Sequence, residues 1–187
     1  MTTAAESRPR KLKKCRICPV RFPPQSMTHV CCSIKCSVEF ARAKREKVER
    51  KNLREAKQKA KTRGQWQAEA QQAFNSFIRS RDDDLPCISC GRWHQGQFHC
   101  GHYLTVGARP NLRFEEQNAH KQCQPCNTHL HGNLVNYRRA LIAKIGIDAV
   151  EGLEADQSVK KYSISDLQQI KADYTRKRKE LEQERDQ

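Results

Sequence analysis

The feature of this sequence that most constrains its fold is a pair of Cys-x-x-Cys motifs in the second half of the chain. Cys87 and Cys90 form the first motif, Cys123 and Cys126 form the second, and 32 residues lie between them. Each motif directs two sulfurs at one ion, and two motifs complete a tetrahedral zinc site. The intervening stretch is long enough for a hairpin and a loop whose ends the metal holds together. We therefore expect these four cysteines to bind one structural Zn²⁺.

Disulfides or ordinary buried thiols are the alternatives to zinc. Residues 1–14 are polar and basic and contain no apolar segment, so we expect no signal peptide. A chain that stays in a reducing compartment keeps its thiols reduced, which favours zinc over disulfides. No run in the sequence approaches the roughly 20 apolar residues that a membrane-spanning helix needs, so we expect no membrane partner.

A second cysteine cluster lies near the N-terminus. Cys15 and Cys18 form one pair, and Cys32 and Cys36 supply the other, in a spacing typical of a small treble-clef-type zinc finger. Cys31 could replace Cys32 as a ligand, and the spacing alone does not decide between them. Small modules with little apolar material for a core often depend on metals. We therefore expect a second structural Zn²⁺ in this finger.

The positive charge of the chain is confined to its N-terminal half. The formal net charge is +15, and residues 1–81 carry 21 Lys or Arg against 6 Asp or Glu, whereas residues 82–187 carry 15 of each kind. A one-sided excess of this size indicates binding to a polyanion, and nucleic acid is the first candidate. A basic helix that is simply solvated is the alternative.

The polar residues around the second cysteine cluster fit a nuclease site of the HNH (ββα-metal) kind. Such a site needs a histidine that deprotonates water, an asparagine that orients the histidine, and a residue on a helix that ligates a divalent metal. His102 follows a strand-like segment, Asn118 precedes the second cysteine motif by five residues, and Asn127 directly follows its last cysteine. We predict these three as the catalytic residues.

The catalytic ion of such a site would be Mg²⁺ or Mn²⁺. We expect Asn127 to bind it together with His131 or His99, and His131 would share a helical face with Asn127 if a helix runs through both. Many HNH sites carry an Asp ligand directly before the base, and this chain has Gly101 there. His99 is the nearest substitute. The zinc ions would stay out of the chemistry, because four thiolates leave no position for water.

Two resemblances make this interpretation more specific. The segment Cys126–Gly132 (CNTHLHG) resembles the corresponding segment of phage endonuclease VII, a zinc-bound Holliday-junction resolvase. The stretch Gly101–Asn133 is similar to the lambdoid-phage NinG (Rap) family of recombination nucleases. That likeness implies a metal-dependent endonuclease that cuts branched recombination intermediates, such as Holliday junctions and D-loops. It also implies a homodimer that acts near the nucleoid in the cytoplasm of the bacterial host.

Two other functions remain open from the sequence. One is a non-catalytic zinc-finger DNA-binding protein of recombination, and the other is a sequence-specific HNH endonuclease. A pure DNA-binding protein has no need of the constellation of His102, Asn118 and Asn127. A sequence-specific HNH enzyme would share the chemistry and differ only in its substrate.

The fold class that these features predict is α+β, small and zinc-stabilised. We expect an HNH-like ββα-metal core, an N-terminal treble-clef-type finger and long charged helices. The expected division is a basic arm with the finger (1–36), a basic helical linker (37–81), the nuclease core (82–146) and a helical tail (147–187).

The expected elements follow from periodicity and capping signals. Strands are expected at 97–104 and 112–114, and helices at 37–61 and 127–145. A further helix should begin at a capping box of Thr62 and Gln65, and the last helix at one of Ser165 and Gln168, fraying beyond Thr175. We expect Asp82, Asp83 and Asp84 to form a solvated loop.

Overall fold

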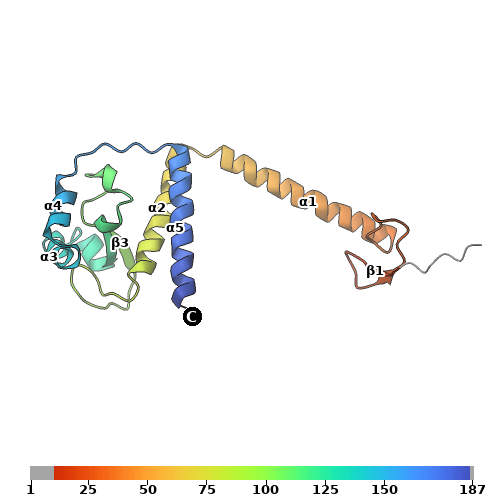
Figure 1. Ribbon diagram of the computed structural model, residues 1–187, viewed down its shortest axis with the longest axis horizontal. Coiled ribbons are helices and arrows are strands. Elements are labelled where there is room, and N and C mark those ends of the chain that lie inside the picture. The colour runs from red at the N-terminus through yellow and green to blue at the C-terminus, as the bar shows by residue number, and fades with distance from the viewer. Residues whose placement is uncertain (1–10, 186–187) are drawn as a thin grey trace, which may run out of the picture. The chain divides into compact units, whose positions relative to one another are not determined.

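The computed structural model describes residues 11–185, and the chain divides into two compact units between Lys61 and Thr62. Figure 1 shows long helices and short two-stranded sheets, which confirms the expected α+β class. The expected four-part division differs from this one. The boundary expected at 36/37 falls inside the first unit, and the boundary expected at 81/82 falls inside the second. Among the described residues, no helix is both long and apolar enough to cross a membrane.

The first unit is a cysteine-rich knuckle followed by one long helix. Strand β1 (Lys13–Lys14) pairs antiparallel with β2 (Arg21–Phe22), and helix α1 runs over Ile34–Lys59. Ser33 caps the helix by accepting a hydrogen bond from the backbone N–H of Cys36. Helix α1 contains no buried residue and carries ten Lys or Arg against four Glu. The exposed basic helix expected over 37–61 is therefore confirmed, with a slightly earlier start.

Two helices that are distant in the sequence form one side of the second unit. Helix α2 (Arg63–Arg81) and helix α5 (Ile164–Arg185) lie side by side (Figure 1). The rings of Phe74 and Tyr174 meet edge-to-face between them, with centroids 4.9 Å apart. The capping box of Thr62 and Gln65 is present as expected.

The start and end of α5 differ from expectation. Ser163 and Asp166 form its capping contacts, in place of Ser165 and Gln168. The helix continues to Arg185, because its second half is held by ion pairs to other elements. Lys177 pairs with Glu116 at 2.6 Å, and Arg185 pairs with Asp83 at 3.3 Å. The expected fraying beyond Thr175 is wrong for this reason.

A β-hairpin forms the centre of the second unit. Strand β3 (Phe98–His102) pairs antiparallel with β4 (Ala119–Cys123), and the register sets Phe98 opposite Cys123 and His102 opposite Ala119. The first expected strand is confirmed, but the second, expected at 112–114, is wrong. That segment follows a 3₁₀ turn at Pro110–Leu112, and a second 3₁₀ turn at Glu116–Asn118 precedes the real strand. Leu112 instead packs in the core.

The hairpin separates two cores, because alternate residues of a strand point to opposite faces. Cys100 packs on one face against Phe74 and Phe77 of α2. On the other face, His99 contacts Asn127 of the segment after β4. That face carries the second core, which the following helices supply with Tyr137, Leu141, Val150 and Leu153.

The helical segment after β4 is broken, whereas a single helix was expected over 127–145. A π-helical turn (η3, Pro125–His129) ends at His129, and α3 (Leu134–Ile145) starts five residues later. The connecting residues His131, Gly132 and Asn133 all have positive φ, at 48°, 90° and 46°. Gly146 then ends α3 as expected and leads into α4 (Ile147–Ala155).

Asp82 is buried, which corrects the expectation of a solvated acidic loop. Its side chain is 4% exposed and accepts two hydrogen bonds from Arg81 at 2.9 Å and one from the backbone N–H of Lys121 at 3.0 Å. Lys144 of α3 adds a contact at 3.4 Å. Burial alone would raise the pKa of Asp82, but the hydrogen bonds and charge of Arg81 outweigh it and lower the pKa. The carboxylate thus joins α2, β4 and α3.

We predict that Asp82→Ala lowers the free energy of unfolding by about 3–5 kcal/mol, because it leaves Arg81 and Lys144 without their buried partner. Because folding lowers the pKa of Asp82, its contribution is fully present above the ordinary value of 3.8 and is lost as the pH falls through the folded-state pKa. Urea unfolding at pH 7 and at pH 3 measures both effects. The control Asp84→Ala, at a side chain 87% exposed, should change stability by less than about 0.5 kcal/mol. Equal stability of the two variants would contradict the assignment.

Candidate metal centres and active site

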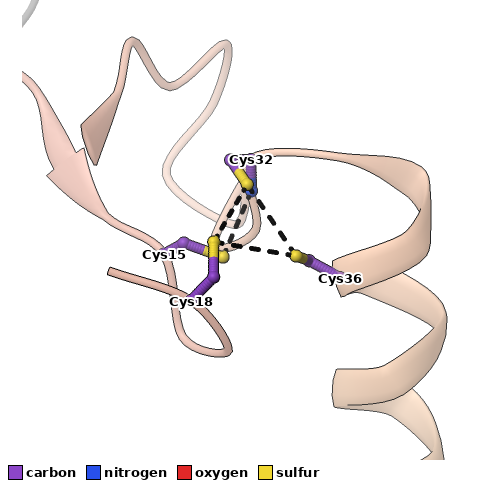
Figure 2. A group of neighbouring side chains, drawn as sticks. All are labelled: Cys15, Cys18, Cys32 and Cys36. Carbon is purple, nitrogen blue, oxygen red and sulfur yellow. Dashed lines mark hydrogen bonds between the residues drawn. The ribbon is translucent and has the colours of Figure 1, made fainter. Parts of the chain in front are cut away.

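The N-terminal cysteine cluster has the dimensions of a zinc site. Figure 2 shows the side chains of Cys15, Cys18, Cys32 and Cys36 pointing toward one another, and their sulfurs all lie within 4.8 Å of each other. The Sγ atoms of Cys18 and Cys32 are 3.4 Å apart, and each lies 3.8 Å from Cys36. Sulfurs bound tetrahedrally at about 2.3 Å from Zn²⁺ would be about 3.8 Å apart.

The structure distinguishes the two adjacent cysteines of this finger. Cys32 belongs to the four-sulfur group, whereas Cys31 is 2% exposed and packs in the small core beside Phe22. Burial raises the pKa of the Cys31 thiol, and hydrogen bonding with Cys18 raises that of Cys32 to about 12, so the positions of the sulfurs decide between them. Cys32 is therefore the candidate ligand and Cys31 a core residue.

The second cluster joins three segments of the hairpin unit. The sulfurs of Cys87, Cys90, Cys123 and Cys126 also lie within 4.8 Å of one another, and those of Cys90 and Cys123 are 3.9 Å apart. Cys87 precedes β3, Cys123 ends β4, and Cys126 lies in the π-helical turn. His94 lies beside the cluster, with Nε2 3.4 Å from the Cys90 sulfur. The group can hold one metal ion.

Backbone N–H groups lower the pKa of one thiol in each cluster, whereas burial and hydrogen bonds with neighbouring thiols raise the pKa of Cys32, Cys90 and Cys123. Hydrogen bonds from the backbone N–H groups of Cys18 and Ile17 lower the pKa of Cys15 to about 6. Burial raises the pKa of Cys87, but backbone N–H groups, led by that of Cys123 at 3.3 Å, outweigh it and lower the pKa. All ten cysteines are free thiols. Two Cys₄ groups that could hold zinc are thus present, as the sequence predicts.

Asn127 and His99 form the polar pair nearest to the second cluster. Asn127 follows Cys126 in the π-helical turn, and its Nδ2 donates to His99 Nδ1 at 2.9 Å. Both side chains are partly exposed. Because the contact uses the amide's donor, it leaves the Asn127 Oδ1 atom for another partner. With Nδ1 accepting, the neutral His99 ring carries its proton on Nε2.

His102 lies at the end of β3, on the face of the hairpin that packs against α2. Its ring centroid is 5.8 Å from that of Phe74, and its Nε2 donates to the carbonyl of Arg113 at 3.1 Å. That bond leaves the lone pair of the neutral ring on Nδ1. Burial lowers the pKa of His102 below its ordinary value of 6.5, so the ring is neutral at neutral pH. Strand alternation places His102 and His99 on opposite faces of the hairpin.

Asn118 is fully buried and holds the backbone beyond His102. Its side-chain hydrogen bonds within the described part of the chain go to the backbone and not to the imidazole ring. Its Oδ1 accepts from the N–H of Leu104 at 2.9 Å, and its Nδ2 donates to the carbonyl of Leu104 at 2.9 Å and to that of Leu112 at 3.4 Å. Its own carbonyl accepts from the N–H of Tyr103 at 2.8 Å. Asn118 therefore fixes the exit of β3, and orients His102 only through the chain.

His131 does not lie on a helical face with Asn127, because the chain turns between them. His131 is exposed and has a positive φ of 48°, beyond the end of the π-helical turn. Of the two expected partners of Asn127, the structure brings only His99 to it.

Gly101 leaves room for the buried side chain of Gln122, which no signal in the sequence indicated. A Cβ at position 101 would lie 2.2 Å from the Oε1 atom of Gln122, so an aspartate cannot fit there with Gln122 in place. Gln122 donates to the carbonyl of Gly132 and to Ser89 Oγ, each at 2.6 Å. Gln122 fills the space that the aspartate ligand of many HNH sites would need.

Two further residues of this face were missed. The Tyr137 hydroxyl donates to the carbonyl of Gly101 at 3.0 Å and lies 3.2 Å from His120 Nδ1. Burial, followed by the charges of Lys144 and Arg81, lowers the pKa of His120 to about 3, so its ring is neutral. These two contacts of Tyr137 join α3 to β3 and β4. A polar residue within a strand is the signal that could have indicated His120, whereas Tyr137 lies in α3.

A divalent ion at the His99–Asn127 pair would need ligands from outside the chain. Between residues 11 and 185, the two Cys₄ clusters are the groups of three or more His, Cys, Asp or Glu that could share an ion. Mg²⁺ keeps several waters and commonly shares substrate phosphates. One amide oxygen on a partly exposed turn fits an ion held jointly with water and phosphate, and does not fit a site built by protein alone.

Comparisons with known proteins agree with one another. The chain matches the family described as Bacteriophage Lambda NinG protein over residues 7–184. It is 41% identical over 186 residues to protein ninG of Escherichia phage lambda, covering 90% of this chain and 91% of that protein. Protein ninG of Salmonella phage P22 is also 41% identical over 186 residues, covering 90% and 92%. That of Escherichia phage 933W is 40% identical over 191 residues, covering 92% and 95%. No solved structure matches.

We predict two zinc ions per chain in freshly purified, reduced protein, measured by elemental analysis. Cys123→Ser should unfold the second unit, because zinc binding supplies folding free energy and serine does not replace a thiolate. Cys18→Ser should leave that unit folded and reduce the count to one zinc. Acidification should release the metal as the thiolates take up protons. Protein that is fully folded by circular dichroism but contains no zinc would contradict both assignments.

Proposed function

Because the chain belongs to the NinG family of bacteriophage proteins, we propose that it is a metal-dependent endonuclease that cuts branched DNA recombination intermediates. The observation that carries the proposal is the contact between Asn127 and His99, directly after a Cys₄ cluster and on a β-hairpin. In this proposal β3, β4 and the segment from Asn127 through α3 serve as an HNH-like ββα-metal core. Two copies would present two such sites to opposite strands of a junction, in the cytoplasm of the bacterial host.

Asn127 supplies the oxygen for Mg²⁺ or Mn²⁺ in this proposal, and His99 positions it. The bond from Asn127 Nδ2 to His99 Nδ1 orients the amide so that Oδ1 is free to bind an ion. An ion held there together with a DNA phosphate would polarise the scissile phosphate and stabilise the leaving 3′ oxygen. His131 has no part in this arrangement, since the chain turns away before it.

His102 is the general base of the proposal, because its hydrogen bonding leaves the correct lone pair. Nδ1 of the neutral ring takes a proton from water, the hydroxide attacks phosphorus, and the bond from phosphorus to the 3′ oxygen breaks. His99 is the rival by position, but in its tautomer Nδ1 accepts from Asn127 and Nε2 already carries a proton. His102 lies on the face of the hairpin toward α2, opposite the His99–Asn127 pair, so the cleavage rate of its variant decides whether it is the base.

A non-catalytic DNA-binding protein is the second candidate function. The observation that favours it is that, within the described residues, the only groups of three or more His, Cys, Asp or Glu able to share an ion are the two cysteine clusters, and neither includes His99. In that case the hairpin face would be a structural neighbour of the zinc cluster. Cleavage measurements separate the two functions.

We predict that His102→Ala binds a four-way junction normally but nicks it about 10²–10⁴-fold more slowly in Mg²⁺ or Mn²⁺, the usual effect of losing a positioned base. The wild-type rate should rise with pH through the pKa of His102, because the neutral ring is the active form. Since burial lowers that pKa, the rate should level off at a lower pH than 6.5 would give. His99→Ala and Asn127→Ala should raise the metal concentration needed and keep the pH profile.

The matched control for these variants is His129→Ala, an exposed histidine of the same turn, which should leave nicking unchanged. Junction, D-loop and linear duplex substrates show whether cleavage depends on a branch. A wild-type nicking rate from His102→Ala would contradict the proposal that His102 is the general base. Lack of nicking by the wild-type, zinc-loaded protein on all three substrates would support the binding function instead.

We also predict that helix α1 grips DNA phosphates without regard to sequence. Replacing exposed cations of its central turns, Lys44, Lys47 and Lys51, by glutamine should flatten the salt dependence of DNA affinity. Each lost phosphate contact removes about 0.9 from the slope of log affinity against log salt. The same replacement at Lys160 and Lys161, exposed in the second unit, should change the slope less. An unchanged slope in the α1 variant would place the contacts elsewhere.

A further inference from the structure

A basic groove with an exposed tryptophan lies on the α2–α5 side of the second unit. Its volume is about 720 Å³, and α2, α5, the loop before β3 and the edge of the hairpin line it. The lining includes one large exposed aromatic side chain and several cations: Arg79, Trp93, Phe98, Lys121, Arg178 and Arg185. None of these residues is a candidate metal ligand or a proposed catalytic residue, although Phe98 packs against the second cysteine cluster.

Trp93 is held in place although it is exposed. Trp93 is 63% exposed to solvent and lies in the loop that leads into β3. The Lys121 ammonium lies 5.0 Å from the Trp93 ring centroid and 4.4 Å from that of Phe98. A cation over an aromatic face is attracted by the ring, so Lys121 fixes the indole while the rest of its surface faces solvent. The result is a flat aromatic platform within a polar groove.

The charge of the groove is positive after its internal ion pairs are considered. Arg178 pairs with Glu182 and Arg185 pairs with Asp83, each at 3.3 Å. Arg79 donates to Ser76 Oγ at 3.2 Å, and Lys121 donates to the Asp83 carbonyl at 2.6 Å. Neither of these contacts involves a carboxylate. Lys121 is buried at 5% exposure and faces the rings of Trp93 and Phe98, so Arg79 is the cation that is available to an anion beside Trp93.

We propose that this groove binds an unpaired nucleotide of the DNA substrate, whose base stacks on Trp93 and whose phosphate contacts Arg79. Aromatic platforms in positively charged grooves bind single strands without sequence preference, because every base has a flat π-face. In a duplex the bases are already stacked inside the helix, so only a branch or a single strand offers one. An acidic peptide would match the charge but has no need of the aromatic platform.

The groove lies close to the proposed catalytic site along the chain. Phe98, which lines it, lies on the same face of β3 as His102, because an even number of positions separates them along the strand. An unpaired nucleotide here would therefore bring a branch point to the hairpin. This role rests on the proposed function for the identity of the substrate, but the binding itself requires neither cleavage nor Mg²⁺.

The test uses the full-length, zinc-loaded protein and a dT oligonucleotide in buffer without Mg²⁺ or Mn²⁺. The chain has two tryptophans, and the other one, Trp66, is buried at 7% exposure. The oligonucleotide should quench the fluorescence of the wild type but not that of Trp93→Ala. Trp93→Ala should also weaken binding about 5- to 150-fold, the range that the loss of one stacked base gives. Trp93→Phe should retain most of the affinity.

Two further variants complete the test. Val159→Ala, at an apolar residue 83% exposed outside the groove, should bind like the wild type. Arg79→Gln should lower the salt slope by about 0.7, the value of one phosphate contact on a single strand. Unchanged affinity of Trp93→Ala would overturn the proposal, as would equal quenching by a dT·dA duplex or by polyglutamate. Because no arm measures cleavage, an inactive wild-type enzyme would count against the proposed function and leave this result standing.

Discussion

The four sulfurs of the second cysteine cluster are the constraint on which the rest of this structure depends. They hold the loop before β3, the end of β4 and the π-helical turn against one another, three segments that share little apolar surface. Structural zinc in small sites supplies roughly 10–16 kcal/mol of apparent binding free energy, which is comparable to the whole stability of a typical domain. The position of Asn127, one residue after Cys126, follows directly from that cluster.

The same cluster stabilises a strained turn that separates Asn127 from α3. His131 and Asn133 have positive φ, which costs about 1–3 kcal/mol for a residue other than glycine. The turn is held because the Gly132 N–H donates to the Cys126 carbonyl at 2.9 Å and Asn133 Nδ2 contacts the Cys126 sulfur at 3.5 Å. Gln122 adds its bond to the Gly132 carbonyl. The π-helical turn that carries Asn127 thereby ends as a separate element, facing the hairpin and His99.

Spacing and capping signals predicted the parts of the fold that local chemistry decides. The two cysteine clusters, the first strand, the capping box at Thr62 and the end of α3 at Gly146 are of this kind. Strand β4 was missed because His120, Lys121 and Gln122 are buried by partners distant in the sequence, so its residues show no apolar alternation. The choice of Cys32 over Cys31 likewise depended on core packing.

Of the residues predicted for the candidate site, the structure brings Asn127 and His99 into contact. Asn127 was identified from its place after the last cysteine, and His99 only as a weak substitute for an aspartate. Their contact depends on the register that sets His99 opposite Gln122, which no local signal contains. The buried carboxylate of Asp82 was missed for the same reason, since two identical neighbours in the sequence remain exposed.

Anomalous diffraction from crystals of the zinc-loaded protein, soaked with Mn²⁺ and a junction that carries uncleavable phosphorothioates, tests the central claim most directly. We expect zinc peaks at both Cys₄ clusters and a separate manganese peak within bonding distance of Asn127 Oδ1 and a DNA phosphate oxygen. His102 Nδ1 should face the water on the opposite side of that phosphate. Zinc peaks alone, with DNA bound and no manganese at Asn127, would contradict a metal-dependent nuclease at this site.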